Sequence, residues 1–233
     1  MVGMLTESDR ARVEAAVKAA ELGTTGEIYC VVAAESSDYL EVPIAWGAIA
    51  ALAAPAVLLA FGVHVTAPDD FGGGWSAAQM SSAAETAARG ALSGAILLQG
   101  VLFVLVAILV AIGPIRRWMT PRALKRERVR RRAHEQFLAK NLQSTRERTG
   151  VLIYVSASEH MAELIADEGI AAKVNDAAWD GAMQRLIDGF KAGRPADGFE
   201  DAIALCGTIL AEHFPPRDDD NPNELSDSVV VLG

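Results

Sequence analysis

Four acidic residues have a spacing that could hold a hard divalent cation. Asp167 follows a short apolar run that we expect to be a strand, and Asp176 and Asp180 stand at the start of the next expected helix. The turn after that strand and the start of that helix can converge, so these carboxylates are candidate ligands for Ca²⁺ or Mg²⁺, with Glu27 as a fourth. A cation held there would neutralise phosphoryl charge and acidify a bound water, as phosphate ester hydrolysis requires.

The same residues also have a structural interpretation. Asp176 can cap its helix, Asp167 can support the turn at Gly169, and Asp180 is favourable in the first helical turn. The spacing lacks the specificity of an EF-hand loop. The sequence therefore leaves two interpretations of these carboxylates open.

Other catalytic groups are harder to find in the sequence. His160 and His213 could act as a general acid or base, but the pattern favours a position in a hairpin turn for His160 and at a helix end for His213. We find no glycine-rich phosphate loop, no Cys–His pair at a usable spacing and no serine elbow, since 156–158 has the pattern of a turn. No catalytic residue is assigned, and Tyr154 and Trp179 are expected in the core.

The elements that must position these residues follow from the apolar pattern. Residues 6–9 form a capping-box signature before an amphipathic helix of about 16 residues that ends at Gly23. Residues 27–33 and 151–155 are almost continuously apolar, which is typical of strands buried on both faces. The five residues between 155 and 161 predict a hairpin, with 161–166 antiparallel to the preceding strand.

Two more helices complete the expected domain, one from about Asp176 to Lys191 and one from Gly198 to His213. Strands with helices on both sides predict an α/β fold, a small mixed β-sheet sandwiched between helices. In this chain the sheet is interrupted, because a long apolar segment separates its first two strands.

That segment predicts a two-helix transmembrane hairpin. Residues 42–68 and 90–115 contain no Asp, Glu, Lys or Arg, and each exceeds the roughly 20 residues that cross a bilayer. We expect spans at about 43–65 and 91–115 with an outer loop at 66–90. The alternative, two buried helices of a soluble protein, fits poorly because such helices are typically shorter.

Basic residues directly after the second span predict its orientation, because Lys and Arg near membrane ends are retained in the cytoplasm. Both termini should then lie in the cytoplasm, with the protein in the inner membrane. These residues should also contact anionic lipids of the inner leaflet, and without aromatic stacking residues they do not indicate nucleic-acid binding. They are Arg116, Arg117, Arg122, Lys125, Arg126, Arg128, Arg130, Arg131 and Arg132.

The predicted organisation has four parts. Residues 1–41 and 116–215 form one split domain, 42–115 form the hairpin, and 216–233 form a disordered acidic tail. Cys30 and Cys206 lie in apolar patterns and are expected as packed, reduced thiols, in keeping with a cytoplasmic domain.

An ordered set of motifs resembles the TPM domain family, named for thylakoid-lumen, photosystem-repair and acetylcholine-receptor-modulating members. The resemblance covers 4–215 apart from the hairpin. The motifs are residues 25–28, 148–156, 165–170, Trp179, Phe190, Gly193, Gly198, 202–203 and 210–215.

The resemblance implies a small sheet between helices, and it implies acid phosphatase activity or calcium binding for some members. It also suggests a coiled-coil membrane protein as partner. We expect this chain to depart from the commoner bacterial pattern of signal peptide, extracytoplasmic domain and C-terminal anchor. We expect a non-catalytic binding or modulatory module for a membrane or envelope protein, with a divalent-cation-dependent phosphatase as the alternative.

Overall fold

The structure is a computed structural model, which describes residues 5–62, 77–216 and 223–232. The chain divides into two units, one made of residues 1–38 and 122–233 and the other of residues 39–121. The first unit is therefore built from two pieces of sequence that the second unit interrupts.

A mixed four-stranded sheet organises the first unit, with the strand order β3-β2-β1-β4. β1 pairs in parallel with β2 and with β4, whereas β2 and β3 are antiparallel and form the predicted hairpin. The α/β fold predicted from the sequence is thereby confirmed. The strands are β1 (Glu27–Ala33), β2 (Gly150–Ser156), β3 (Met161–Ala166) and β4 (Val230–Leu232).

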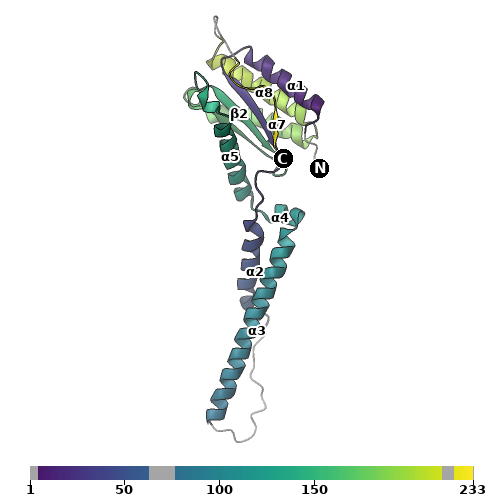
Figure 1. Cartoon of the computed structure of the whole chain (residues 1–233), viewed down its shortest axis with the longest axis vertical. Coiled ribbons are helices and arrows are strands. Elements are labelled where there is room, and N and C mark those ends of the chain that lie inside the picture. The colour runs from purple at the N-terminus through teal and green to yellow at the C-terminus, as the bar shows by residue number, and fades with distance from the viewer. Residues whose placement is uncertain (1–4, 63–76, 217–222, 233) are drawn as a thin grey trace. The chain divides into compact units, whose positions relative to one another are not determined.

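Helices cover both faces of this sheet (Figure 1). Alternate residues of each strand point to opposite faces, so Ile28 and Cys30 join one apolar cluster while Tyr29 and Val31 join another. The first face packs against three helices and the second against α5. These helices are α1 (Glu7–Glu21), α7 (Asp180–Lys191), α8 (Pro195–His213) and α5 (Arg122–Ala139).

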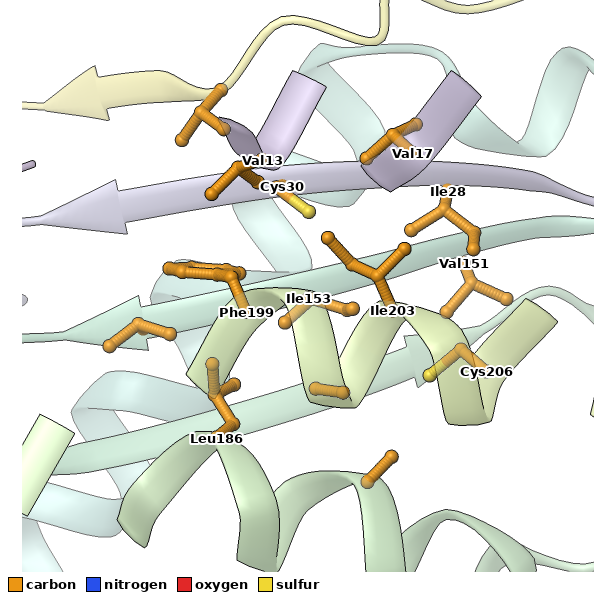
Figure 2. Packing of buried hydrophobic residues seen from close by; sticks show 14 of the residues in the cluster. Val13, Val17, Ile28, Cys30, Val151, Ile153, Leu186, Phe199, Ile203 and Cys206 are labelled. Carbon is orange, nitrogen blue, oxygen red and sulfur yellow. The ribbon is translucent and has the colours of Figure 1, made fainter. Parts of the chain in front are cut away.

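The larger apolar cluster lies between the sheet and helices α1, α7 and α8. Figure 2 shows Phe199 and Ile203 of α8 over Ile153 of β2, with Val17 of α1 close to the same layer. Phe199, Ile203 and Val17 are 0% exposed. Burial on both faces explains why the sequences of β1 and β2 show no polar alternation.

Short elements connect these layers: η1 (Leu142–Ser144), α6 (Glu168–Ala171) and η2 (Asp176–Trp179). The helix expected from Asp176 is thus a 3₁₀ turn followed by α7, which begins at Asp180. α8 begins at Pro195, earlier than the expected Gly198, because proline fits the first helical turn, where its missing N–H has no partner to lose.

The end of the chain differs from the predicted disordered tail at 216–233. Val230–Leu232 forms β4 beside β1, and the Ala34 N–H donates to the Leu232 carbonyl at 3.0 Å. The run at 229–232 is apolar and β-favouring, and β1 offers it an edge to pair with. Residues 217–222, with most of the acidic run, lie outside the described residues.

The second unit contains α2 (Glu41–Ala60), α3 (Ala77–Ala111) and α4 (Gly113–Met119). By length and composition, Glu41–Ala60 and Ala88–Ala111 could each cross a membrane, which supports the predicted spans weakly. α3 extends the second span into the expected outer loop, where the sequence from 77 to 91 is rich in alanine. Residues 63–76 lie outside the description.

Contacts inside the second unit hold α2 and α3 close together. A Cβ on Gly47 of α2 would lie 2.9 Å from the Phe103 carbonyl oxygen of α3. The indole Nε1–H of Trp46 donates to the Met119 carbonyl at 3.2 Å. Leu52 and Leu97 are 77% and 70% exposed, so the outward sides of this pair are apolar, as lipid contact requires.

A close crossing of α7 and α8 generates a testable prediction. A Cβ on Gly189 would lie 2.4 Å from the Gly198 Cα, so Gly189→Ala must push two backbones apart. We expect it to lower the free energy of unfolding by about 2 kcal/mol or more, measured by chemical denaturation in detergent.

Gly181 on the same helix is the matched control, because a Cβ there would meet nothing within 4 Å. Gly181→Ala should be neutral or stabilising by up to about 1 kcal/mol. Equal effects of the two substitutions would contradict the close crossing.

Candidate functional site

Two of the four predicted carboxylates line one groove beside β3. Asp176 of η2 and Asp180 of α7 lie on one side of it, and Arg130 and His134 of α5 lie on the other. Glu163 of β3 contributes a third carboxylate, and the groove has a volume of about 340 Å³. We call it the β3 groove.

Local structure leaves the two aspartates at the surface. Asn175, rather than Asp176, caps η2, because its side-chain oxygen accepts the Ala177 N–H at 3.0 Å. Trp179 between them is only 4% exposed and joins the core cluster. Both carboxylates are therefore exposed, on either side of the buried Trp179. The interpretation of Asp176 as a helix cap is wrong.

The opposite wall of the groove is basic. Arg130 Nε lies 3.9 Å from a carboxylate oxygen of Glu163, which is the polar residue of the central part of β3. Burial raises the pKa of Glu163, while the charges of Arg130, His134 and Arg126 act in the opposite direction. The groove thus brings carboxylates and cations together along one edge of the sheet.

Asp167 has a different role from the two groove aspartates. It is 5% exposed and is the N-cap of α6, where its Oδ1 accepts the Glu168 N–H at 2.7 Å. Its own N–H donates to the Gly150 carbonyl at 2.9 Å and continues the β2–β3 ladder. Its Oδ2 is buried with no hydrogen-bond partner among the described residues.

Glu27 binds the C-terminal segment. Its carboxylate oxygens accept the N–H groups of Glu224 and Leu225, each at 3.2 Å. Burial raises the pKa of Glu27, and these two hydrogen bonds oppose that effect. The contact fixes the chain that leads into β4.

Glu21 extends this acidic contact on α1. Burial is the main cause that raises its pKa to about 8, and the nearby Glu27 and Asp227 add to the effect, Asp227 also by a hydrogen bond. Glu21 also accepts the Ile28 N–H at 2.8 Å. Lys18 Nζ lies 4.0 Å from Asp227 Oδ2. We call Glu21, Glu27 and Asp227 the tail-docking cluster.

The four predicted cation ligands do not come together at one place. Asp176 and Asp180 share a groove, but Asp167 and Glu27 bind backbone N–H groups outside its lining. Among the described residues, no three His, Cys, Asp or Glu side chains are placed to share a metal ion. The four residues together do not fit one metal site.

The two histidines adopt the structural positions considered in the sequence analysis. His160 has a φ of 52° in the turn between β2 and β3. One ring nitrogen of His213, Nδ1, lies 3.0 Å from the Ile209 carbonyl in the last turn of α8. Neither residue lines the β3 groove.

A buried polar network joins the ends of β1 and β2, and sequence analysis missed it. The Ser36 hydroxyl donates to Ser156 Oγ at 2.8 Å and lies 3.0 Å from the Tyr154 hydroxyl. Ser156 in turn donates to the Glu159 carboxylate. Burial raises the pKa of Tyr154. The signal in the sequence was a serine close to the end of each apolar run, Ser36 for the first strand and Ser156 for the second. The carboxyl ends of two neighbouring parallel strands lie side by side.

An apolar cavity of about 440 Å³ lies between the β2–β3 turn and the C-terminal half of α7. Sequence analysis did not predict it, because its walls come from elements far apart in the chain. Its apolar lining includes Val155, Met161, Ile187 and Phe190, and Lys191 also borders it.

The fold and these contacts define a split α/β sandwich domain with a charged groove along one edge strand. Residues 117–209 match the sequence model of the TPM domain. The NMR structure of the BA42 protein from the psychrophilic bacterium Bizionia argentinensis is similar, with a TM-score of 0.55 at 19% identity. The similarity covers 98% of this chain and 96% of BA42. No curated protein matched.

Residues 117–209 thus match the TPM domain, in agreement with the motifs in the sequence, and a pair of apolar helices interrupts the split domain. The likeness to BA42 concerns the fold alone at this level of identity.

The tail-docking cluster predicts a pH dependence of stability. Glu21 binds its proton more tightly in the folded state than in the unfolded state. Its contribution to the free energy of unfolding is therefore full below its ordinary pKa of 4.5 and is lost as pH rises through about 8. Glu21→Gln keeps the acceptor for Ile28 and resembles the protonated acid. Above pH 8 it should raise the free energy of unfolding by on the order of 1–3 kcal/mol.

Denaturation of the full chain at a series of pH values measures this effect. Glu14→Gln is the control, since Glu14 is on the same helix and is paired with exposed Lys18 at 2.8 Å. Stability of the unsubstituted protein that stays level from acid to above pH 8 would refute the assignment.

Proposed function

We propose that the protein is a two-pass membrane protein whose TPM domain is a non-catalytic binding or modulatory module for another membrane or envelope protein. The observation that carries this proposal is the parallel pairing of β1 with β2 from Glu27–Gly150 to Ala33–Ser156. These strands flank the two apolar helices in sequence, so both ends of the hairpin must return to one side of the membrane.

Charge supports the cytoplasmic side for that domain. The nine basic residues from Arg116 to Arg132 follow the second apolar helix in sequence, and such residues are retained in the cytoplasm. Each cation near an anionic inner leaflet contributes roughly 1 kcal/mol of attraction. Cys30 and Cys206 are buried, unpaired thiols, which suits a reducing compartment.

The β3 groove supports binding over hydrolysis. Its carboxylates are exposed and face basic side chains of α5, and two of the four expected cation ligands are engaged elsewhere by backbone N–H groups. A mixed-charge surface beside an edge strand suits recognition of another polypeptide. The alternative is a divalent-cation-dependent phosphatase, supported by the presence of Asp176, Asp180 and His134 in one groove.

Hydrolysis of p-nitrophenyl phosphate by the purified full chain, with Mg²⁺ or Ca²⁺, separates the two functions. We expect the same background rate for the unsubstituted protein and for the double variant Asp176→Asn, Asp180→Asn. Asp188→Asn is the control, because Asp188 lies on α7 outside the groove and accepts a hydrogen bond from Gln184.

Metal-dependent hydrolysis that the double variant loses and the control retains, at equal thermal stability, would overturn the binding-module proposal in favour of the phosphatase.

A further inference from the structure

We propose that the outer edge of β3 binds an extended peptide segment of the partner by strand addition. The segment would place a large apolar side chain in the cavity at the Met161 end of β3 and a Lys or Arg at the Ala166 end. This inference rests on the proposed binding function and names the chemistry of the partner.

The first argument is that β3 is a regular edge strand. It stands last in the sheet order β3-β2-β1-β4. Its six residues pair with β2 in unbroken register, without a bulge. It contains no proline or lysine, which are common devices for closing an edge. No other strand in the described part of the chain pairs with its outer side.

Hydrogen-bonded and non-bonded residue pairs alternate between β2 and β3, and this alternation identifies the backbone groups of β3 that face outward. The Asp167 N–H donates to the Gly150 carbonyl at 2.9 Å, and bonded pairs alternate with non-bonded pairs along antiparallel strands. Ile165 and Glu163 therefore bond to β2, whereas Ala162, Leu164 and Ala166 direct their N–H and C=O groups away from it. A peptide strand would bond to these three residues.

The apolar cavity and the β3 groove lie at opposite ends of this edge, and residues of α7 line both of them. Ile187 and Phe190 line the apolar cavity with Met161, at the start of β3. Met183 and Asp180 line the β3 groove with Ala166, at the end of β3. α7 therefore runs antiparallel to β3. Strand addition typically combines backbone bonding with separate pockets for side chains.

The chemistry of each end specifies the ligand. The lining of the cavity includes Val155, Met161, Ile187 and Phe190, with His160 and Lys191 also bordering it, and its mostly apolar surface suits an aromatic or large aliphatic side chain. The groove presents exposed Asp176 and Asp180, while Arg130 lies near Glu163 and opposes its charge. A cation is the complement of the two aspartates. The two volumes lie at Met161 and Ala166, the two ends of β3, so we place the cation four residues from the apolar anchor, where an extended peptide presents both side chains on the same side.

At the other edge of the sheet, a segment of the chain itself is bound by strand addition. Val230–Leu232 adds to β1 as an extended strand, and the preceding segment is fixed by Glu27 through the N–H groups of Glu224 and Leu225. An extended segment with a few specific contacts is therefore sufficient to extend this sheet.

The test uses the full chain in nanodiscs and fluorescent heptapeptides of threonine, with Phe as second and Lys as sixth residue. Fluorescence anisotropy should show saturable binding. Replacing Lys by Glu should weaken binding at least tenfold, and N-methylation of alternate peptide N–H groups should abolish it.

Ala162→Pro removes one outward N–H without touching a bond to β2, and we expect it to weaken binding at least tenfold at unchanged thermal stability. The control is Asp188→Asn, because Asp188 lies on α7 but lines neither the cavity nor the β3 groove. In amide exchange, the peptide should slow exchange at Leu164 and Ala166 and leave Glu163 and Ile165 unchanged.

The proposal is overturned if the Lys peptide does not bind at millimolar concentration, or if it binds no better than the Glu peptide. It is also overturned if Ala162→Pro converts a dimer to a monomer, since the occupant would then be a second copy of the chain. Each of these results leaves the phosphate ester assay unaffected, so failure of this inference is distinguishable from failure of the proposed function.

Discussion

The parallel pairing of β1 with β2 is the interaction on which the rest of the structure depends. The two strands lie on opposite sides of the inserted helices in sequence, yet their register runs without a break from Glu27–Gly150 to Ala33–Ser156. Loop-closure entropy grows slowly with loop length, and packing of α2 against α3 shortens the effective loop further. Both apolar clusters form on opposite faces of this strand pair, so the pairing creates the core as well as the sheet.

The two edges of the sheet then differ in a way that suggests separate roles. β4 covers β1 at one edge, and near it burial raises the pKa of Glu21 in the tail-docking cluster to about 8. The β3 edge carries outward backbone groups between an apolar cavity and a charged groove. In the proposed function, the chain's own segment closes one edge of the sheet and the other edge is available to a neighbouring polypeptide.

Sequence reasoning was most successful where the signal is local. The apolar runs predicted β1 and β2, and the short link after Val155 predicted the antiparallel β3. β4 could not be predicted because its three residues become a strand only beside β1. The four predicted cation ligands do not lie at one site, for a similar reason. The position of Asp167 in its turn was correct, but the binding of Glu27 to residues 224 and 225 depends on a contact across almost the whole sequence.

The most direct test of the account is labelling with a membrane-impermeant maleimide in cells that make the full chain. Glu7→Cys and Asp201→Cys lie in the two pieces of the split domain, with side chains 94% and 61% exposed. Native Cys206 should react little, since burial raises its pKa to about 12. We expect both introduced cysteines to be protected in intact cells and labelled together after the inner membrane is permeabilised. Labelling of only one of them in intact cells would contradict a single domain built from both pieces.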